Sequence, residues 1–332
     1  MKMKALHLTA PNKLEVVEKE TPKPRKGQVL VKMAYSPINP SDLAFLTGQY
    51  GIQKPFPTVP GFEGSGTVME SGGGFYANFL KGKRVACVAH EKLDGPWAEY
   101  MVTEAGRCVA LDKGVTFEQG SMSFVNPMTA LDFIDKAKSG GFSGIVMSAA
   151  ASSLSKMVHH LARKEGLAFA GVVRRAGQVE KLKTWEVDLV VNSESEAWRD
   201  ELKSWAGSKG KLLFPDAVGG GDLPSKVLSC LPSESLMLIY GSMNQEDPGA
   251  YIPRLFIFNE YEIAGYWLSK EAGRRSFFQS LMMTRRVQQM LKSGFESDIQ
   301  AKFRLENFQD ALTMYTENMS KGKVLFELGG DS

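Results

Sequence analysis

The residues best suited to chemistry in this chain form a turn of small side chains at residues 148–155, Ser-Ala-Ala-Ala-Ser-Ser-Leu-Ser. An apolar strand predicted at 144–150 leads into it, and a helix follows. At such a place a glycine-rich turn normally lets backbone N–H groups approach a pyrophosphate. This turn has no glycine, but its residues are small, and N–H groups and serine hydroxyls remain as donors. We therefore interpret Ser152, Ser153 and Leu154 as a phosphate cradle, the alternative being weak or lost cofactor binding.

Two adjacent arginines, Arg174 and Arg175, follow a second apolar strand predicted at 167–173. Enzymes selective for NAD usually carry an Asp or Glu here for the ribose hydroxyls. Two guanidinium groups instead suit a 2′-phosphate, through bidentate, charge-assisted hydrogen bonds. An arginine pair is most often a solvated surface feature, but this position in the fold favours NADPH as the cofactor.

The sequence predicts no metal site. The three cysteines, Cys87, Cys108 and Cys230, are far apart and odd in number, so a disulfide framework is not expected. Cys87 and His90 are the one pair worth testing as ligands. On a strand, however, residues three apart point to opposite faces, which favours a plain strand end.

The elements that must position these residues change in character near residue 122. Before it, the chain is strand-like, with strands predicted at 27–35, 64–70, 84–90 and 97–102. After it, strands and helices alternate. Further strands are expected at 187–192, 212–218, 235–241 and 261–267, and helices at 124–138 and from Leu154 to a stop at Gly166. This alternation predicts a doubly wound parallel sheet. After Trp267, a long amphipathic helix is expected to run to about Lys292 and stop at Gly294.

Composition excludes several classes of function. The 332 residues carry a net charge of +3, with Lys and Arg scattered along the sequence. The sequence alone therefore gives no footprint for nucleic acid or for anionic lipid. The N-terminus lacks the apolar core of a signal peptide, and no apolar run is long enough to span a membrane. We expect a reduced, cytoplasmic protein.

The run at residues 36–66, SPINPSDLAFLTGQYGIQKPFPTVPGFEGSG, resembles the start of the medium-chain dehydrogenase/reductase superfamily. In its zinc alcohol dehydrogenases, a Cys lies in the neighbourhood of Ser36–Asn39 and a His stands where Phe62 does here. A phenylalanine cannot donate a lone pair to zinc, and no nearby Cys replaces the thiolate. The chain is instead similar, over essentially its whole length, to the zinc-free branch of quinone oxidoreductases and 2-enoyl thioester reductases.

The resemblance implies an α/β fold with two domains. A GroES-like β-barrel domain would comprise residues 1–122 and 268–332, and a Rossmann domain, with the doubly wound parallel sheet, residues 123–267. It also implies a homodimer. The side chains that it places along NADPH are Asn126, Thr129, Tyr240, Gly241, Ser242, Met243, Tyr266, Trp267 and Lys323. For Tyr266 and Trp267, simple packing at the end of a strand is the alternative.

Tyr50, in the run Thr47-Gly48-Gln49-Tyr50-Gly51, matches the tyrosine that enoyl thioester reductases place over the substrate as a proposed proton donor. Hydride delivered to a double bond conjugated to a carbonyl leaves an enolate, which needs hydrogen-bond donors and a proton. A phenol with a pKa near 10 stays protonated at neutral pH and can serve. Quinone oxidoreductases also carry a Tyr in this loop, and packing against the domain cleft is the alternative.

The resemblance thus implies an NADPH-dependent, metal-free oxidoreductase that transfers hydride to an activated C=C, in a 2-enoyl thioester or enone, or to a quinone. Two alternatives stay open: a dedicated NADPH:quinone reductase, and a catalytically silent protein that binds NADPH or a partner. The partner expected for an active enzyme is a small electrophilic acceptor.

Overall fold

The computed structural model describes residues 1–293 and 295–329. It divides into two compact units, Met1–Val125 with Leu281–Ser332, and Asn126–Ser280. The domains proposed from the sequence, 1–122 with 268–332 and 123–267, place the second boundary earlier. The difference arises because helix α10 (Leu268–Arg274) groups with the second unit, where the following Arg275 forms an ion pair with Asp132.

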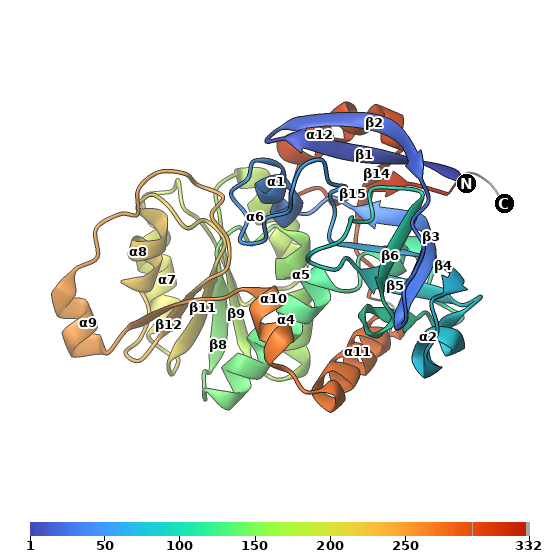
Figure 1. Ribbon diagram of the computed structural model, residues 1–332. Coiled ribbons are helices and arrows are strands. Elements are labelled where there is room, and N and C mark those ends of the chain that lie inside the picture. Colours follow the sequence, from blue (N-terminus) through green and yellow to red (C-terminus); the bar gives the residue numbers. More distant parts are fainter. Residues whose placement is uncertain (294, 330–332) are drawn as a thin grey trace. The chain divides into compact units, whose positions relative to one another are not determined.

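The second unit contains a sheet of six parallel strands, in the order β10–β9–β8–β11–β12–β13 (Figure 1). In chain order these are β8 (Gly144–Met147), β9 (Ala168–Val173), β10 (Leu189–Asn192), β11 (Leu212–Asp216), β12 (Leu236–Ile239) and β13 (Glu262–Gly265). The strand order reverses at β8 and β11, so this is the doubly wound arrangement that binds ligands at the carboxyl ends of its strands. The predicted parallel sheet is confirmed.

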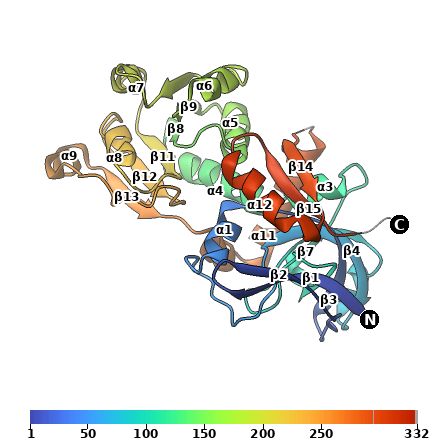
Figure 2. The ribbon, with the colours of Figure 1, turned by 90° about the horizontal axis from the view of Figure 1, so that it is seen from above.

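Helices cover both faces of this sheet, with α4 and α5 on one side and α7 and α8 on the other (Figure 2). The helices of this unit are α4 (Val125–Ser139, entering from the first unit), α5 (Ser153–Lys164), α6 (Ala176–Lys183), α7 (Trp198–Ala206), α8 (Leu223–Leu228), α9 (Pro253–Asn259) and α10. Strands buried on both faces read as apolar runs, as β8 does and as β11 does up to its final Asp216, and every residue of both strands is buried.

The strands of the first unit pair antiparallel, except for β14 and β15, which are parallel. β1 (Lys2–Ala10) pairs with β2 (Lys13–Glu20). A seven-stranded sheet runs β14–β15–β3–β4–β5–β7, with β6 also paired to β3. Its strands are β3 (Gln28–Pro37), β4 (Glu63–Ser71), β5 (Arg84–Val88), β6 (Tyr100–Glu104), β7 (Cys108–Ala110), β14 (Ile299–Phe303) and β15 (Lys323–Glu327). The helices are α1 (Pro40–Leu46), α2 (Phe75–Leu80), α3 (Phe117–Ser121) and α12 (Phe308–Glu317).

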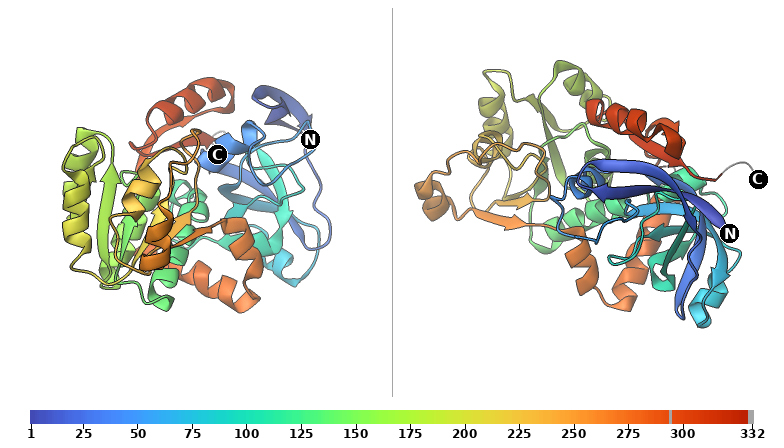
Figure 3. Two further views of the ribbon diagram at one scale, coloured as in Figure 1. Left: turned by 90° about the vertical axis from the view of Figure 1, so that its left-hand side faces the viewer. Right: turned by 45° about the horizontal axis from the view of Figure 1, so that its top comes forward.

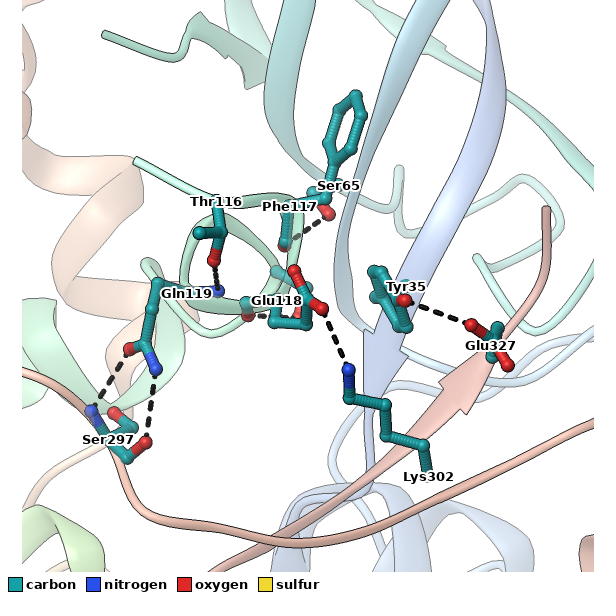
Figure 4. A network of polar contacts seen from close by, with 10 residues as sticks. Tyr35, Ser65, Thr116, Phe117, Glu118, Gln119, Ser297, Lys302 and Glu327 are labelled. Atoms are coloured by element: carbon teal, nitrogen blue, oxygen red, sulfur yellow. Dashed lines mark hydrogen bonds and ion pairs between the residues drawn. The ribbon is translucent and has the colours of Figure 1, made fainter. Parts of the chain in front are cut away.

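The C-terminal strands are fastened to the N-terminal part of this unit by polar contacts (Figure 4). Lys302 Nζ on β14 donates to Glu118 Oε1 on α3 over 2.8 Å. The Tyr35 hydroxyl on β3 donates to Glu327 Oε1 on β15 over 2.9 Å. Helix α12, red in Figure 3, packs on β14 and β15. The tail therefore completes the β-rich unit, as expected.

The single long helix predicted after Trp267 is wrong. The chain forms α10 and then α11 (Phe277–Lys292), with Arg275 between them in an extended conformation. Arg275 turns out of the helix to pair with Asp132. The predicted stop at Gly294 lies outside the described residues. Among the residues described, we find no helix long and apolar enough to cross a membrane.

Candidate cofactor and substrate sites

The serine turn between β8 and α5 has the geometry of an anion site. Ser152 caps α5, its hydroxyl accepting from the Ser155 N–H over 3.2 Å. The N–H groups of Ser153 and Leu154 belong to the first turn of the helix and have no backbone acceptor among the described residues. The Ser155 hydroxyl is buried and has no hydrogen-bond partner within the described part of the chain. Donors at a helix start, together with an unsatisfied buried hydroxyl, fit a pyrophosphate.

Small residues let the turn lie close to the sheet without glycine. Ala150 and Ala151 are buried, and the Ala150 N–H donates to the Val172 carbonyl over 3.2 Å. The glycine needed for the close approach lies instead on β9, where a Cβ on Gly171 would stand 2.9 Å from the Ala150 Cβ. Ala149 takes a left-handed conformation at φ 47°, which a glycine would adopt without strain.

Asp216, at the end of β11, holds the turn in place and was not singled out from the sequence. Its Oδ1 accepts from the Ser148 hydroxyl over 2.6 Å, and its Oδ2 from the Gly219 N–H over 2.8 Å. Burial raises the pKa of this carboxyl, which is fully enclosed. A second missed residue is Lys181 on α6, whose ammonium lies 3.4 Å from the Ala151 carbonyl. For Asp216, the available signal in the sequence was a single Asp at the end of the apolar run LLFPD.

Arg174 and Arg175 lie directly after β9, and both side chains are exposed. Their backbone N–H groups donate to Gln178 Oε1 over 3.3 and 3.2 Å, which fixes the backbone at the start of α6. Both guanidinium groups are exposed and form no ion pair among the described residues, so they can meet an anion beyond the strand end.

The segment after β12 packs backbone to backbone on the segment after β11. The Tyr240 N–H donates to the Asp216 carbonyl over 3.0 Å, and the Met243 N–H to the Ala217 carbonyl over 3.1 Å. A Cβ on Gly241 would stand 2.7 Å from the Ala217 oxygen, so this position requires glycine. Ser242 and Met243 are exposed at the same edge of the sheet as the serine turn.

Thr129, Tyr240 and Tyr266 gather around Phe133 on α4. The Phe133 ring lies 5.2 Å from that of Tyr240 and 5.0 Å from that of Tyr266. The Tyr266 hydroxyl donates to Asp132 Oδ2 over 2.6 Å and also contacts Thr129. Burial and the Asp132 charge raise the pKa of Tyr266, so the phenol stays protonated. Asn126 lies earlier on α4, in its first turn. Trp267, directly after Tyr266, is 38% exposed.

In the first unit, Tyr50 lies on the loop after α1. Its ring is 4.9 Å from that of Phe62, the residue that stands where zinc enzymes have histidine. Gln53 Nε2 donates to the Tyr50 carbonyl over 2.7 Å and shapes the loop. Lys54, not singled out from the sequence, is nearly buried and donates to the Leu93 carbonyl over 2.6 Å. Burial lowers the pKa of Lys54 to about 8.

A buried polar cluster joins α1, β4 and β15, and we call its members Asn39, Asp42, Glu63 and Lys323 the buried cluster. Asn39 Nδ2 donates to Glu63 Oε1 over 3.1 Å, and Lys323 Nζ donates to Asn39 Oδ1. Glu63 Oε2 accepts from the N–H groups that begin α4, both over 3.0 Å. From the sequence, Lys323 is expected to lie along the cofactor. In the structure its side chain is only 3% exposed, and its ammonium is directed at Asn39.

Burial shifts the pKa values of the three ionisable side chains in the buried cluster. Burial raises the pKa of Asp42 to about 7 and also raises that of Glu63, whereas it lowers the pKa of Lys323. Asp42 Oδ2 accepts from the Asn39 N–H over 2.8 Å, which fixes the backbone at the start of α1. Within residues 1–293 and 295–329, no three His, Cys, Asp or Glu side chains form a group able to hold a metal ion.

The sheet brings together two cysteines that are far apart in the sequence. Cys87 on β5 and Cys108 on β7 are directly paired across the two strands, and both are buried as free thiols. Hydrogen bonding with Cys108, followed by burial, raises the pKa of Cys87 well above its usual value. These thiols are therefore unreactive core residues.

Comparisons with known proteins agree with this architecture. Residues 25–113 match the alcohol dehydrogenase GroES-like domain, which confirms the expected barrel domain. The chain is 32% identical over 249 residues to a mitochondrial enoyl-[acyl-carrier-protein] reductase of Arabidopsis thaliana, covering 74% of this chain and 65% of that relative. A crystal structure described as an NADPH:quinone reductase from Mesorhizobium loti is 33% identical, covers 98% of each chain and superposes with a TM-score of 0.89. The Etr1p–NADP–crotonyl-CoA complex shares the fold at 20% identity, with 98% of this chain and 100% of that one covered and a TM-score of 0.83.

Proposed function

Because this chain belongs to the medium-chain dehydrogenase/reductase superfamily, in the branch of quinone reductases and enoyl thioester reductases, we propose that it is an NADPH-dependent oxidoreductase. Its acceptor would be an activated C=C, in a 2-enoyl thioester or an enone, or a quinone. The observation that carries the proposal is the serine turn at the start of α5, with the unsatisfied buried hydroxyl of Ser155.

The residues of the second unit would bind and orient the cofactor. Ser152, Ser153 and Leu154 would meet the pyrophosphate with helix N–H groups and hydroxyls. Arg174 and Arg175 would bind the 2′-phosphate, which selects NADPH over NADH. When bound, NADPH supplies the hydride.

The remaining cofactor-side residues would line the nicotinamide end. These are Asn126, Thr129, Tyr240, Gly241, Ser242, Met243, Tyr266 and Trp267. Tyr266 is held by Asp132, so it would act as a fixed wall rather than as a proton donor. Lys323 would act on the cofactor side only indirectly, through the hydrogen bond that its ammonium donates to Asn39.

Tyr50 would donate a proton to the reduced acceptor. Hydride addition at the β-carbon of an enoyl thioester leaves charge on the carbonyl oxygen and a carbon that must be protonated. The Tyr50 ring is set by Phe62, and its loop by Gln53. Lys54, with a pKa lowered to about 8, is a second group able to exchange a proton near neutral pH.

The choice of acceptor separates the proposal from its closest alternative, a dedicated NADPH:quinone reductase, which the Mesorhizobium loti relative favours. The experiment is a fluorescence titration with NADPH and NADH, followed by turnover on crotonyl-CoA, an enone and a benzoquinone. We expect NADPH-selective binding and turnover on at least one C=C acceptor. Turnover on the quinone alone would establish the dedicated quinone reductase. Tight binding with no turnover on any acceptor would favour the silent NADPH-binding protein, and no binding would overturn the cofactor site itself.

We also propose a homodimer formed through β13, the edge strand of the parallel sheet. Its residues are largely exposed, and Ile263 is an apolar side chain 39% exposed there. An open strand edge of this kind pairs readily with a second copy. Analytical ultracentrifugation tests this, and Ile263→Lys should shift the protein to monomer. A cytoplasmic location is part of the same proposal, supported by three buried free cysteines.

A further inference from the structure

Helix α2 in the first unit exposes its aromatic side chains. Phe75 is 92% exposed, Phe79 52% and Tyr76 41%, whereas Ala77 and Leu80 are buried against the sheet. The neighbouring Met69 on β4 is 44% exposed. We call Met69, Phe75, Tyr76 and Phe79 the aromatic patch. Single exposed apolar residues are ordinary, but a contiguous group of large ones marks an interaction site.

Contacts hold two members of the aromatic patch, Tyr76 and Phe79, in place. The rings of Tyr76 and Phe79 stack with their centroids 6.0 Å apart, and the Tyr76 hydroxyl donates to the Cys108 carbonyl over 3.1 Å. Lys83 Nζ lies 3.1 Å from the centroid of the Phe79 ring. The Val68 N–H donates to the Lys83 carbonyl over 3.0 Å, so the segment that follows α2 lies along β4, the strand that carries Met69. The patch is therefore a preformed surface.

Cations from two distant segments border the aromatic patch. Arg25 and Lys26 lie on the loop beside Gly72–Gly74, where the Gly27 N–H donates to the Gly73 carbonyl over 2.8 Å. A Cβ on Gly72 would stand 1.9 Å from the Arg25 carbonyl oxygen, so the glycine allows this approach. Lys81 and Lys83 follow α2 directly.

Positive charge prevails around the aromatic patch. Arg25, Lys26 and Lys81 are exposed, and in the part of the chain that the structure describes none of them pairs with a carboxylate. The nearby carboxylates are those of Glu70 on β4 and Glu104 on β6, and Gln28 Nε2 donates to Glu104. The border therefore favours an anionic partner.

We propose that the aromatic patch and its basic border dock the protein on an anionic lipid surface. Aromatic side chains settle at the level of the lipid headgroups, where an apolar ring meets a polar boundary. Lys and Arg near an anionic surface each strengthen such binding several-fold. Helix α2, cyan in Figure 1, lies at the outer edge of the barrel unit, and its Phe75 and Phe79 side chains are exposed there. A deep protein interface would instead need a pocket around the aromatic anchors.

No lipid footprint is visible in the sequence because β3, α1, β4 and α2 separate Arg25–Lys26 from Lys81–Lys83. Only the fold gathers them. The inference does not depend on the proposed reductase activity, and its test can fail or succeed independently of it.

The test is co-sedimentation of the full-length protein with vesicles of phosphatidylcholine containing about 30% phosphatidylglycerol, and with vesicles of phosphatidylcholine alone. We expect binding to the anionic vesicles that weakens with salt. Phe75→Ser should weaken binding at least about fivefold, and Lys26→Glu/Lys81→Glu at least about tenfold. Phe75 and these lysines are exposed, so folding is not at risk.

Matched controls come from other surfaces of the chain. Phe258→Ser removes an aromatic side chain that is 77% exposed on α9, and Lys13→Glu/Lys164→Glu reverses two exposed lysines elsewhere. Both should leave vesicle binding unchanged. The proposal is overturned if wild type ignores anionic vesicles, binds both vesicle types equally, or binds as well with Phe75→Ser as without it. Self-association lost in Phe75→Ser, without vesicle binding, would assign the patch to a second copy instead.

Discussion

The Ser148 hydroxyl donates to Asp216 across 2.6 Å, joining the ends of β8 and β11 where the strand order of the sheet reverses. The same hydroxyl accepts from the Ala217 N–H over 2.9 Å. One buried side chain therefore sets the spacing between the serine turn and the segment after β11. That spacing determines whether a glycine-free turn can still receive a pyrophosphate.

Replacing Ser148 by Ala should weaken NADPH binding without unfolding the protein. The change leaves the buried Asp216 oxygen and the Ala217 N–H without a partner, at a cost of about 1–3 kcal/mol. We expect a lower Tm and a Kd for NADPH raised several-fold, measured by thermal unfolding and fluorescence titration. Ser208→Ala, at an exposed site beyond α7, is the control. A lower Tm with an unchanged Kd would separate this hydrogen bond from the binding site.

Arg174→Ala/Arg175→Ala should cost NADPH affinity and spare NADH. Each charge-assisted hydrogen bond to a phosphate contributes about 1.5–3 kcal/mol, so we expect NADPH to weaken at least about tenfold. Parallel titrations measure both cofactors, with Arg254→Ala on the exposed face of α9 as control. Equal losses for NADPH and NADH would remove the arginine pair from cofactor selection.

Tyr50→Phe should lower turnover at least about tenfold and leave NADPH affinity alone, because only the phenol proton is removed. The Phe ring keeps the packing on Phe62. Steady-state kinetics on every accepted substrate measure the effect, and Tyr100→Phe on β6 serves as the control. Wild-type turnover on all of them would exclude Tyr50 from the mechanism.

The stability of the first unit should depend on pH through Asp42. Its pKa of about 7 in the folded protein lies above the value of about 3.9 in an unfolded chain. The folded state therefore holds this proton more tightly, so the stabilisation is complete below about pH 4 and is lost as the pH rises through about 7. Asp42→Asn can still accept from the Asn39 N–H but cannot titrate.

We expect the difference in unfolding free energy between Asp42→Asn and wild type to grow in favour of the variant from about pH 4 to about pH 8. Urea unfolding at a series of pH values measures it. Asp310→Asn, at an exposed position on α12, should give a difference that does not change with pH. If the difference in unfolding free energy between Asp42→Asn and wild type did not change with pH, Asp42 would be ionised over this whole pH range.

Lys323→Met should destabilise the protein by about 3–5 kcal/mol, because it leaves buried carboxylates without their counter-ion. Adding Glu63→Gln should recover part of the loss, since Glu63 is the charge that most opposes the lowered pKa of Lys323. Urea unfolding of the four proteins of this cycle measures the coupling. NADPH titration of the folded variant then decides between a structural lysine and one that also serves the cofactor.

Much of the second unit followed from the sequence because its central strands, β9, β8, β11 and β12, are largely buried and read as apolar runs. The apolar face predicted for α5 is buried at Leu154, Met157, Val158 and Ala162. Gly166 has a φ of 69°, the left-handed conformation expected where a helix ends.

Other features depend on contacts between distant parts of the chain and leave no local pattern. Gly273 is a weak helix former near Arg275, but no local pattern shows that Arg275 pairs with Asp132, on another helix. Lys323 and Asn39 are 284 residues apart, so no window of sequence contains the buried cluster. Asp216 resembles any strand-end aspartate until its partner Ser148 is known.

The discontinuous first unit has a consequence for synthesis. β15 pairs with β3, but the ribosome makes β15 only after the whole of Asn126–Ser280. Until then, the nascent barrel has an unpaired strand edge and holds Glu63 and Asp42 without their lysine. The second unit, made of one continuous stretch, can reach its native state first, because domains fold as units during translation. Completion of the barrel is then a late, long-range event, and chaperones can bind the unfinished barrel until β15 has been made.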